Sequence, residues 1–239
     1  MPATETTVRE IALENPASIR VFEELGIDYC CGGHKFLTQA CRERALDPSA
    51  VLAALDAARE PAEKLGIDWS KVGLDSFCEH IVTKHHAYVR DEVPRLMQFA
   101  QQVLTRHGDR HPELVEVQEL VRALGEELLV HTGKEEAVLF PYITNLERNL
   151  PRCGPPAPGC FGTVKNPIRV MLADHEAAGE MMAQIREASG NYTAPAGACS
   201  TWQGFYQALD ELERDLHQHV HLENNILFPR AIELEESYG

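Results

Sequence analysis

His131-Thr-Gly-Lys-Glu135-Glu-Ala-Val-Leu-Phe-Pro141 and His219-Val-His-Leu-Glu223-Asn-Asn-Ile-Leu-Phe-Pro229 are two copies of one pattern, in which a histidine precedes a glutamate by four residues and Leu-Phe-Pro closes the copy. Residues four apart lie on the same face of an α-helix. Each copy therefore directs an imidazole and a carboxylate to one place. The two copies together predict a site for two metal ions.

A lone histidine lies about 45 residues upstream of each copy, His86 before the first and His175 before the second. Each lies in its own amphipathic stretch, so the chain reads as two helical hairpins that repeat one arrangement. Hydrophobic residues at steps of three and four predict that both histidines and both His/Glu pairs face inward. The expected stripes, helix by helix, are Val82, His86, Val89, Val93 and Leu96; Leu114, Val117, Val121, Leu124, Leu128, His131, Glu135 and Val138; Ile168, Leu172, His175, Gly179 and Met182; and Phe205, Leu209, Leu212, Leu216, His219, Glu223 and Ile226.

Six inward polar groups at one level of a helical bundle need partners, because a buried carboxylate or imidazole without one is costly. Any one of them alone could be a hydrogen-bonded core residue. Four imidazoles, two carboxylates able to bridge and no thiolate in the pattern favour a pair of first-row metal ions in a four-helix bundle. We expect iron, with manganese or zinc as alternatives.

Composition restricts the partners and the compartment. The formal net charge of -15 disfavours nucleic acid and anionic membranes, since both require a basic surface. The first residues have no charged start, apolar core or cleavage site, and no stretch reaches the roughly 20 apolar residues that span a bilayer. Seven cysteines, an odd number, fit a reducing compartment better than a disulfide framework. The sequence therefore predicts a soluble cytoplasmic protein.

The chain is all-α in this interpretation and exceeds one four-helix bundle by about 70 residues. We expect a small N-terminal helical domain over 1–60, a linker over 61–75 and the bundle over 76–239. Residues 7–25 have helical character interrupted at Pro16, and Asp47-Pro48-Ser49 opens another short helix. Ser76-Phe-Cys-Glu79 and Asn166-Pro167 predict the starts of two bundle helices.

Asp28-Tyr-Cys30-Cys31-Gly-Gly33 is the second distinctive motif. Adjacent cysteines followed by paired glycines place two thiols on a turn that a partner can approach closely. Such thiols can be redox active or bind a soft metal. The alternative is a small helical domain whose turn cysteines are incidental.

The Asp28–Gly33 turn, the two His-x-x-x-Glu motifs and the closing Leu222-Glu-Asn-Asn-Ile-Leu-Phe-Pro229 together resemble the repair-of-iron-centres family. Members are bacterial di-iron proteins with a cysteine-bearing N-terminal domain and a hemerythrin-like bundle. The resemblance covers nearly the whole chain. It implies a role in restoring iron-sulfur clusters damaged by nitric oxide or oxidants, with the di-iron centre as an iron source.

The resemblance also implies functional residues and partners. Two iron ions, oxo- or hydroxo-bridged, would have Glu135 and Glu223 as bridging carboxylates, and Cys30 and Cys31 would act in repair. The partners would be damaged iron-sulfur proteins and, as small ligands, nitric oxide or dioxygen; a homodimer is possible. Reduction of nitric oxide and hemerythrin-like gas sensing remain alternative functions, so turnover is left open. The metal ligands carried over by position are His86, His131, Glu135, His175, His219 and Glu223.

His107 matches a histidine typical of the family, but 21 residues of helix separate it from His86 by roughly 31 Å. A kink at Pro94 does not remove that distance, so we treat His107 as a residue of the helix end or of the ligands' surroundings. A loop containing Cys153 and Cys160 departs from shorter members and is interpreted as a tolerated insertion, with a regulatory disulfide or transient metal as alternatives. The remaining histidines considered, His34, His80, His85, His111 and His217, are expected at the surface or at helix caps.

Overall fold

The computed structural model describes residues 6–58, 67–149 and 162–237. Within these ranges every regular element is a helix, and one isolated β-bridge joins Thr7 to Phe36. The expected all-α fold is confirmed. No helix in the described ranges is both long enough and apolar enough to cross a membrane.

The chain divides into two compact units. Unit 1 consists of residues 1–72 together with Val220–Arg230, and unit 2 consists of Gly73–His219 and Ala231–Gly239. The segment Val220–Arg230 thus belongs to unit 1, although it continues the last predicted bundle helix.

Unit 1 contains four short helices, and three of them begin or end at a capping residue. Thr7 and Glu10 form a capping box at the first helix, and Asp47 caps the fourth helix ahead of Pro48. Gly26 ends the second helix in the left-handed conformation, with φ 64°. The helices are α1 (Val8–Glu14), α2 (Ser18–Leu25), α3 (Leu37–Glu43) and α4 (Pro48–Ala57).

The α3 helix was not expected from the sequence. It covers a single short amphipathic segment in which Leu37, Ala40 and Cys41 are buried, too few positions to establish a period. Its apolar face completes a core shared with the other three helices of unit 1. Tertiary packing therefore stabilises this helix more than its intrinsic propensity does.

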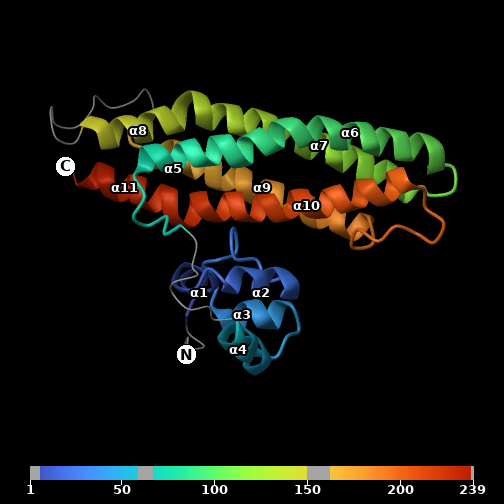
Figure 1. The fold of residues 1–239 in the computed structure, drawn as a ribbon, viewed down its shortest axis with the longest axis horizontal. Coiled ribbons are helices and arrows are strands. Elements are labelled where there is room, and N and C mark those ends of the chain that lie inside the picture. Colours follow the sequence, from blue (N-terminus) through green and yellow to red (C-terminus); the bar gives the residue numbers. More distant parts are fainter. Residues whose placement is uncertain (1–5, 59–66, 150–161, 238–239) are drawn as a thin grey trace. The chain divides into compact units, whose positions relative to one another are not determined.

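Four long helical rods follow, and Figure 1 shows them side by side. The first begins with α5 (Leu74–Ile81) and ends with α6 (Ala87–His107); the second begins with α7 (Glu113–Lys134) and ends with α8 (Phe140–Asn149). The third rod is α9 (Lys165–Ala188). The fourth begins with α10 (Ser200–Leu222) and ends with α11 (Phe228–Glu236).

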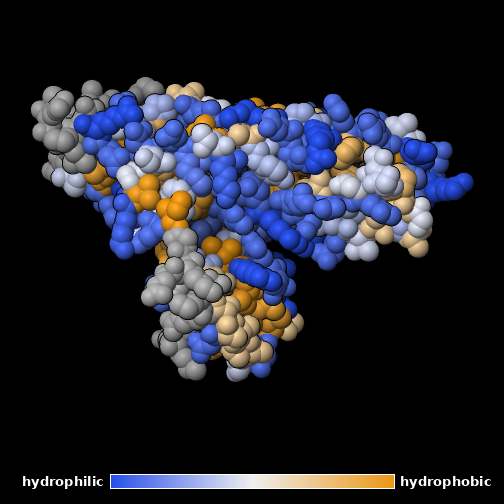
Figure 2. Space-filling view, in the orientation of Figure 1, coloured by the Kyte–Doolittle hydropathy of each residue, from blue (hydrophilic) through white to orange (hydrophobic). Residues whose placement is uncertain are grey.

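The buried stripes of α6, α7, α9 and α10 form one apolar core. Most expected positions are buried, but the third stripe runs through Met171 and Ala178, whereas Leu172 is exposed. The prediction that Leu172 and Gly179 belong to this buried stripe was therefore wrong by one residue at each position. Figure 2 shows that the visible face of the helical bundle is predominantly hydrophilic.

Three of the rods contain a π-helical turn at the level of the predicted ligands. These turns are η2 (Val82–His86), η3 (Glu135–Leu139) and η4 (Glu223–Leu227). A π turn adds one residue to a helical turn and shifts every later position on the helix face. Consequently Leu139 is buried, whereas Val138, expected in the stripe, is 45% exposed. π turns of this kind often occur at functional sites.

Carboxylates from neighbouring helices cap two of the bundle helices. Glu147 accepts the backbone N–H groups of Leu74 and Asp75 at 2.8 and 3.0 Å, and Glu235 accepts the Val164 N–H at 3.0 Å. The first helix therefore starts at Leu74 and α9 starts at Lys165. The starts expected at Ser76 and Asn166 were wrong because distant residues supply these caps.

Candidate metal centre

Two pairs of histidines face each other inside the bundle. The Nε2 atoms of His86 and His219 lie 3.2 Å apart, and those of His131 and His175 lie 2.9 Å apart. All four side chains are buried. The structure therefore directs four imidazole nitrogens inward as two close pairs.

Glu135 and Glu223 join both pairs. Each is the first residue of a π-helical turn and is fully buried. Glu135 Oε2 lies 3.4 Å from His86 Nε2 and 3.3 Å from His131 Nε2, so one carboxylate oxygen lies near a histidine of each pair. The two resulting groups of potential metal ligands, in which the donor atoms lie within 4.8 Å of one another, are His86, Glu135, His219 and Glu223, and His131, Glu135, His175 and Glu223.

Carboxylates behind the histidines orient two of the rings. His86 Nδ1 lies 2.9 Å from Glu136 Oε1, and His131 Nδ1 lies 3.3 Å from Asp174 Oδ2. Burial would raise the pKa of each carboxyl, but the hydrogen bonds from the imidazoles and from neighbouring cations lower both. Ionised carboxylates that accept from Nδ1 leave Nε2 as the lone-pair nitrogen, the arrangement common for histidines that bind metals.

The two thiols of unit 1 lie on a turn organised by Asp28. Its Oδ1 accepts the N–H groups of Cys30 and Cys31, each at 3.0 Å, and its Oδ2 accepts that of Gly32 at 2.9 Å. The sulfur atoms are 3.9 Å apart. A Cβ at Gly33 would lie 2.6 Å from the Tyr29 carbonyl oxygen, so the tight turn requires glycine. The structure thus holds both thiols next to one carboxylate, and these three residues form a further group of potential metal ligands.

Comparisons with known proteins agree with both parts of this arrangement. A family model described as the hemerythrin HHE cation binding domain matches residues 79–231, and one described as a domain of unknown function (DUF542) matches residues 4–59. The iron-sulfur cluster repair proteins YtfE of Enterobacter sp. (strain 638), Escherichia coli O157:H7 and Escherichia fergusonii are each 35% identical over 224 residues, which are 93% of this chain and 94% of each relative. The chain belongs to the iron-sulfur cluster repair protein family.

The hemerythrin HHE domain of this family member implies binding of two iron ions. The donor set in the structure fits that metal pair, because it provides two groups of nitrogen and oxygen ligands that share two carboxylates, without a thiolate. A structural zinc site would require four ligands and often cysteine. The Nε2 atoms within each histidine pair lie close together, as expected for ligands that bind the same metal ion.

His85 was expected at the surface, and that expectation is wrong. Its side chain is fully buried, with Nδ1 2.9 Å from Asp215 Oδ1 and its ring stacked 5.3 Å from that of His219. Burial lowers the pKa of His85 despite the neighbouring carboxylate. The signal in the sequence was weak, because η2 widens the helix there and brings two adjacent histidines inside together.

His221 and Asn225 were also missed. Asn225 Nδ2 donates to the Tyr29 carbonyl oxygen at 3.1 Å and lies 2.8 Å from His221 Nδ1, while the His221 ring packs against that of Tyr29. Burial lowers the pKa of His221 to about 4. Both residues lie in the part of unit 1 contributed by Val220–Arg230, where they hold the backbone just before Cys30. Only the fold reveals this contact across the sequence.

Among the described residues, none of the other histidines considered in the sequence belongs to the two groups of potential metal ligands. His107 is the last residue of α6, a helix end as expected, and His34 is exposed. His80, His111 and His217 are partly exposed. The loop cysteines Cys153 and Cys160 lie outside the described residues.

Proposed function

We propose that the chain repairs iron-sulfur clusters damaged by nitrosative or oxidative stress and supplies iron from its di-iron centre. The observation that carries this proposal is the pair of four-ligand groups that share Glu135 and Glu223. The repair function in the names of the 35% identical relatives supports it. The iron is cargo in this account, and the damaged iron-sulfur protein is its acceptor.

Each ligand has a role in the proposal. His86 and His219 would hold one iron, His131 and His175 the other, and Glu135 and Glu223 would bridge them, with an oxo or hydroxo bridge between the ions. Bound there, the pair would supply exchangeable iron and a position for a small ligand such as nitric oxide or dioxygen. Glu136 and Asp174 would hold the imidazoles in the tautomer that binds metal.

The choice of ligands suits release of iron. Carboxylates and neutral imidazoles bind iron less firmly than thiolates do, and protons compete with the metal for them. Arg90 and Lys134 contact Glu136 and Asp174 and are themselves about half exposed. Two chains of polar contacts therefore lead from ligands toward the surface. One runs from His86 through Glu136 to Arg90, and the other runs from His131 through Asp174 to Lys134.

We also propose that residues 1–60 form a thiol-bearing domain, that 61–75 are a linker and that 76–239 form the iron-binding bundle. The matches over 4–59 and 79–231 support this division. Cys30 and Cys31 would receive iron on its way to the acceptor. Cys31 is the more accessible of the two, because Cys30 is buried. Free thiols persist in the cytoplasm, where the protein would act; a homodimer stays a prediction.

Iron transfer tests the proposed function directly. The anaerobic, iron-loaded protein is mixed with a dehydratase whose iron-sulfur cluster has been damaged by nitric oxide, and iron content and activity of the dehydratase are followed. We expect the dehydratase to regain iron and activity as the repair protein loses iron. Formation of nitrous oxide over many turnovers without loss of iron would instead indicate a nitric oxide reductase.

The role of the thiols is tested in the same assay. We expect the double variant Cys30→Ser/Cys31→Ser to keep its iron but to transfer it about tenfold more slowly, because hydroxyls bind iron poorly. Cys78→Ala, which removes a buried thiol of the bundle, is the matched control and should transfer iron at the normal rate. Equal rates for the double variant and the original protein would remove Cys30 and Cys31 from the mechanism.

A further inference from the structure

A second cluster of reactive side chains lies far from the metal ligands. His107 ends the 21-residue helix α6, roughly 31 Å along the axis from His86. Its Nε2 lies 3.2 Å from Sγ of Cys199, a free and partly exposed cysteine. A thiol and an imidazole at this distance form a nucleophile and a proton acceptor, the combination found where cysteines react.

The surroundings hold this pair in place. The indole of Trp202 is almost completely buried, and its centroid lies 5.0 Å from that of the His107 ring. The His111 ring packs edge-on against the same indole, with the centroids 4.8 Å apart. The Cys199 carbonyl accepts the Gln203 N–H at 3.1 Å, so the thiol lies directly before the first turn of α10. The N-terminus of a long helix favours negative charge at this position.

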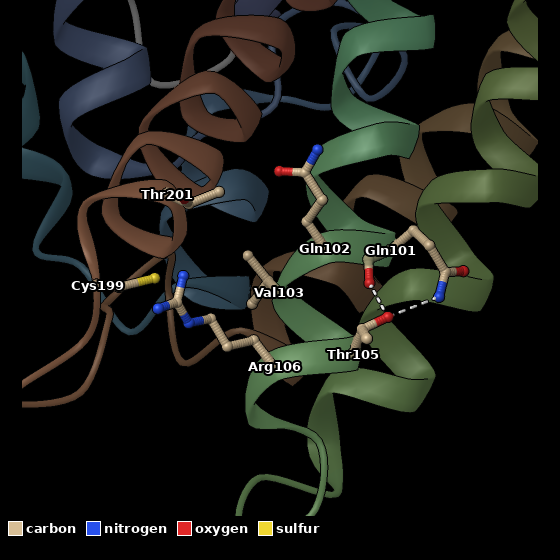
Figure 3. Close-up of a pocket in the computed structure, with 7 residues that line it drawn as sticks. All are labelled: Gln101, Gln102, Val103, Thr105, Arg106, Cys199 and Thr201. Atoms are coloured by element: carbon tan, nitrogen blue, oxygen red, sulfur yellow. Dashed lines mark hydrogen bonds between the residues drawn. The ribbon is translucent and has the colours of Figure 1, made fainter.

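A hollow of about 330 Å³ opens beside the thiol, and Figure 3 shows the side chains that line it. Arg106 provides a positive charge and Val103 an apolar contact. Amides and hydroxyls make up most of the remaining wall, from Gln101, Gln102, Thr105 and Thr201. Nitric oxide or a peroxide would need no such space. A hollow of this size, with a guanidinium and several amide groups, suits a small peptide that carries carboxylates.

We propose that Cys199 is a site of mixed-disulfide formation with a small anionic peptide thiol of the glutathione class. His107 takes the proton of the Cys199 thiol, and the thiolate attacks one sulfur of the peptide disulfide. The protein–peptide S–S bond forms as the peptide S–S bond breaks; Cys199 is oxidised, and the departing peptide sulfur is reduced and receives the proton from His107. Arg106 attracts a peptide carboxylate. This site is separate from the metal centre and does not depend on the proposed repair function.

Glutathione disulfide is the probe, added to the full-length, iron-loaded protein at pH 7. Mass spectrometry of proteolytic peptides gives the modification rate at Cys199, with Cys31 as an internal reference in the same sample. We expect His107→Gln to slow modification of Cys199 about tenfold, since an unassisted thiol is only a few per cent ionised at pH 7. The rate at Cys31 should stay the same.

The pH profile separates chemistry from a structural effect. Arg106 lines the same hollow as Cys199, and His111, whose ring packs against Trp202, has its Nδ1 2.9 Å from Glu113 Oε1. We expect the His107→Gln rate to approach that of the original protein above about pH 9, where thiols ionise without help. A tenfold deficit that persists at alkaline pH would overturn the role of His107. No adduct at Cys199, or an unchanged rate in His107→Gln at pH 7, would overturn the proposal.

Charge recognition has its own control. We expect Arg106→Gln to react about threefold more slowly with glutathione disulfide, an effect the size of an exposed ion pair. The same variant should react normally with the uncharged disulfide of 2-mercaptoethanol. Arg169→Gln, an exposed arginine of α9 outside the hollow, should change neither rate. If Arg106→Gln leaves the glutathione disulfide rate unchanged, the hollow does not select an anionic peptide.

Discussion

Cys30 and Cys31 are neighbours in the sequence, but their side chains lie in different surroundings. Cys30 is buried, whereas Cys31 is partly exposed. The hydrogen bond to Cys31, burial and the nearby Asp28 carboxylate all raise the pKa of the Cys30 thiol well above its ordinary value. The Cys30 thiol should therefore remain protonated at neutral pH.

Alkylation measures this difference. At pH 7 we expect iodoacetamide to label Cys31 at least about tenfold faster than Cys30, because the thiolate is the reactive form and Cys30 is buried and protonated. Fragmentation spectra of the peptide that contains both cysteines give the two rates. The gap should narrow as the pH rises. Equal labelling of the two thiols at pH 7 would contradict the environment described for Cys30.

The shared position of Glu135 distinguishes it from the histidines. Because Glu135 belongs to both ligand groups and His175 to only one, we expect Glu135→Ala to lose both irons and His175→Ala to keep one. Glu126→Gln, an exposed glutamate of α7, should keep both. Iron per chain, measured with circular dichroism as a check of folding, tests the assignment. Retention of a full iron pair in Glu135→Ala would rule out a bridging role.

Much of the candidate site could be predicted from the sequence. The i, i+4 spacing of His131 and Glu135 and its second copy require only helical geometry, and both pairs lie inside the bundle as expected. His85 could not be predicted, because its burial depends on the π turn that places it beside His86. The contact of Asp174 with His131 could not be predicted either, because it depends on which helix packs against His131. The spacing of residues along one helix does not give that information.

At the scale of the elements, the π turns shift which residues of a helix face the core. A fixed 3.6-residue period predicts that Val138 is buried, but η3 adds a residue and turns Leu139 inward instead. The same shift buries Leu227 at η4. Each turn begins or ends at a predicted ligand. The irregular turns thus coincide with the site, and ordinary periodicity holds away from it.

The packing of α6 against α7 depends on a small residue. A Cβ at Gly125 would lie 2.7 Å from Val93 Cγ1, closer than real contacts allow. We expect Gly125→Ala to reduce the free energy of unfolding by about 1–2 kcal/mol, since overpacking exceeds the gain in helix propensity. Urea denaturation measures this change.

Gly204 provides the matched control for that substitution. Nothing lies within 4 Å of a Cβ placed there. Gly204→Ala should therefore raise the free energy of unfolding by up to about 1 kcal/mol, through propensity alone. An increase in the free energy of unfolding of Gly125→Ala would contradict the expected overpacking between α6 and α7.

Glu235 stabilises the start of α9 in a pH-dependent manner. Burial alone would raise the pKa of Glu235, but hydrogen bonds from Thr163, Tyr142 and the Val164 N–H lower it overall. The unfolded chain therefore takes up the proton first as the pH falls. The stabilisation is complete above the ordinary carboxyl pKa and is lost as the pH falls through the lower value of the folded protein.

Replacement of Glu235 tests this dependence. We expect Glu235→Gln to reduce the free energy of unfolding by about 1–2 kcal/mol at pH 7 and by less below about pH 4. Glu233→Gln, an exposed neighbour on α11, should have little effect at either pH. Urea denaturation at pH 7 and pH 3.5 gives the comparison. If Glu235→Gln reduced the free energy of unfolding equally at both pH values, the ionised Glu235 carboxylate would not be what stabilises the start of α9.

At the scale of the whole molecule, the doubled motif was sufficient to predict the all-α class and the bundle. It could not predict that Val220–Arg230 packs as part of unit 1, because Asn225 and Tyr29 meet across nearly 200 residues of sequence. The same segment contains Glu223, one of the shared carboxylates of the metal centre.

Anaerobic metal analysis combined with Mössbauer spectroscopy of the iron-loaded protein measures whether the inward histidines and glutamates hold a pair of irons. We expect two irons per chain, magnetically coupled and in nitrogen and oxygen surroundings, with no signal from thiolate-bound iron. A single iron per chain, two uncoupled irons, or preferential binding of zinc under the same conditions would contradict this expectation.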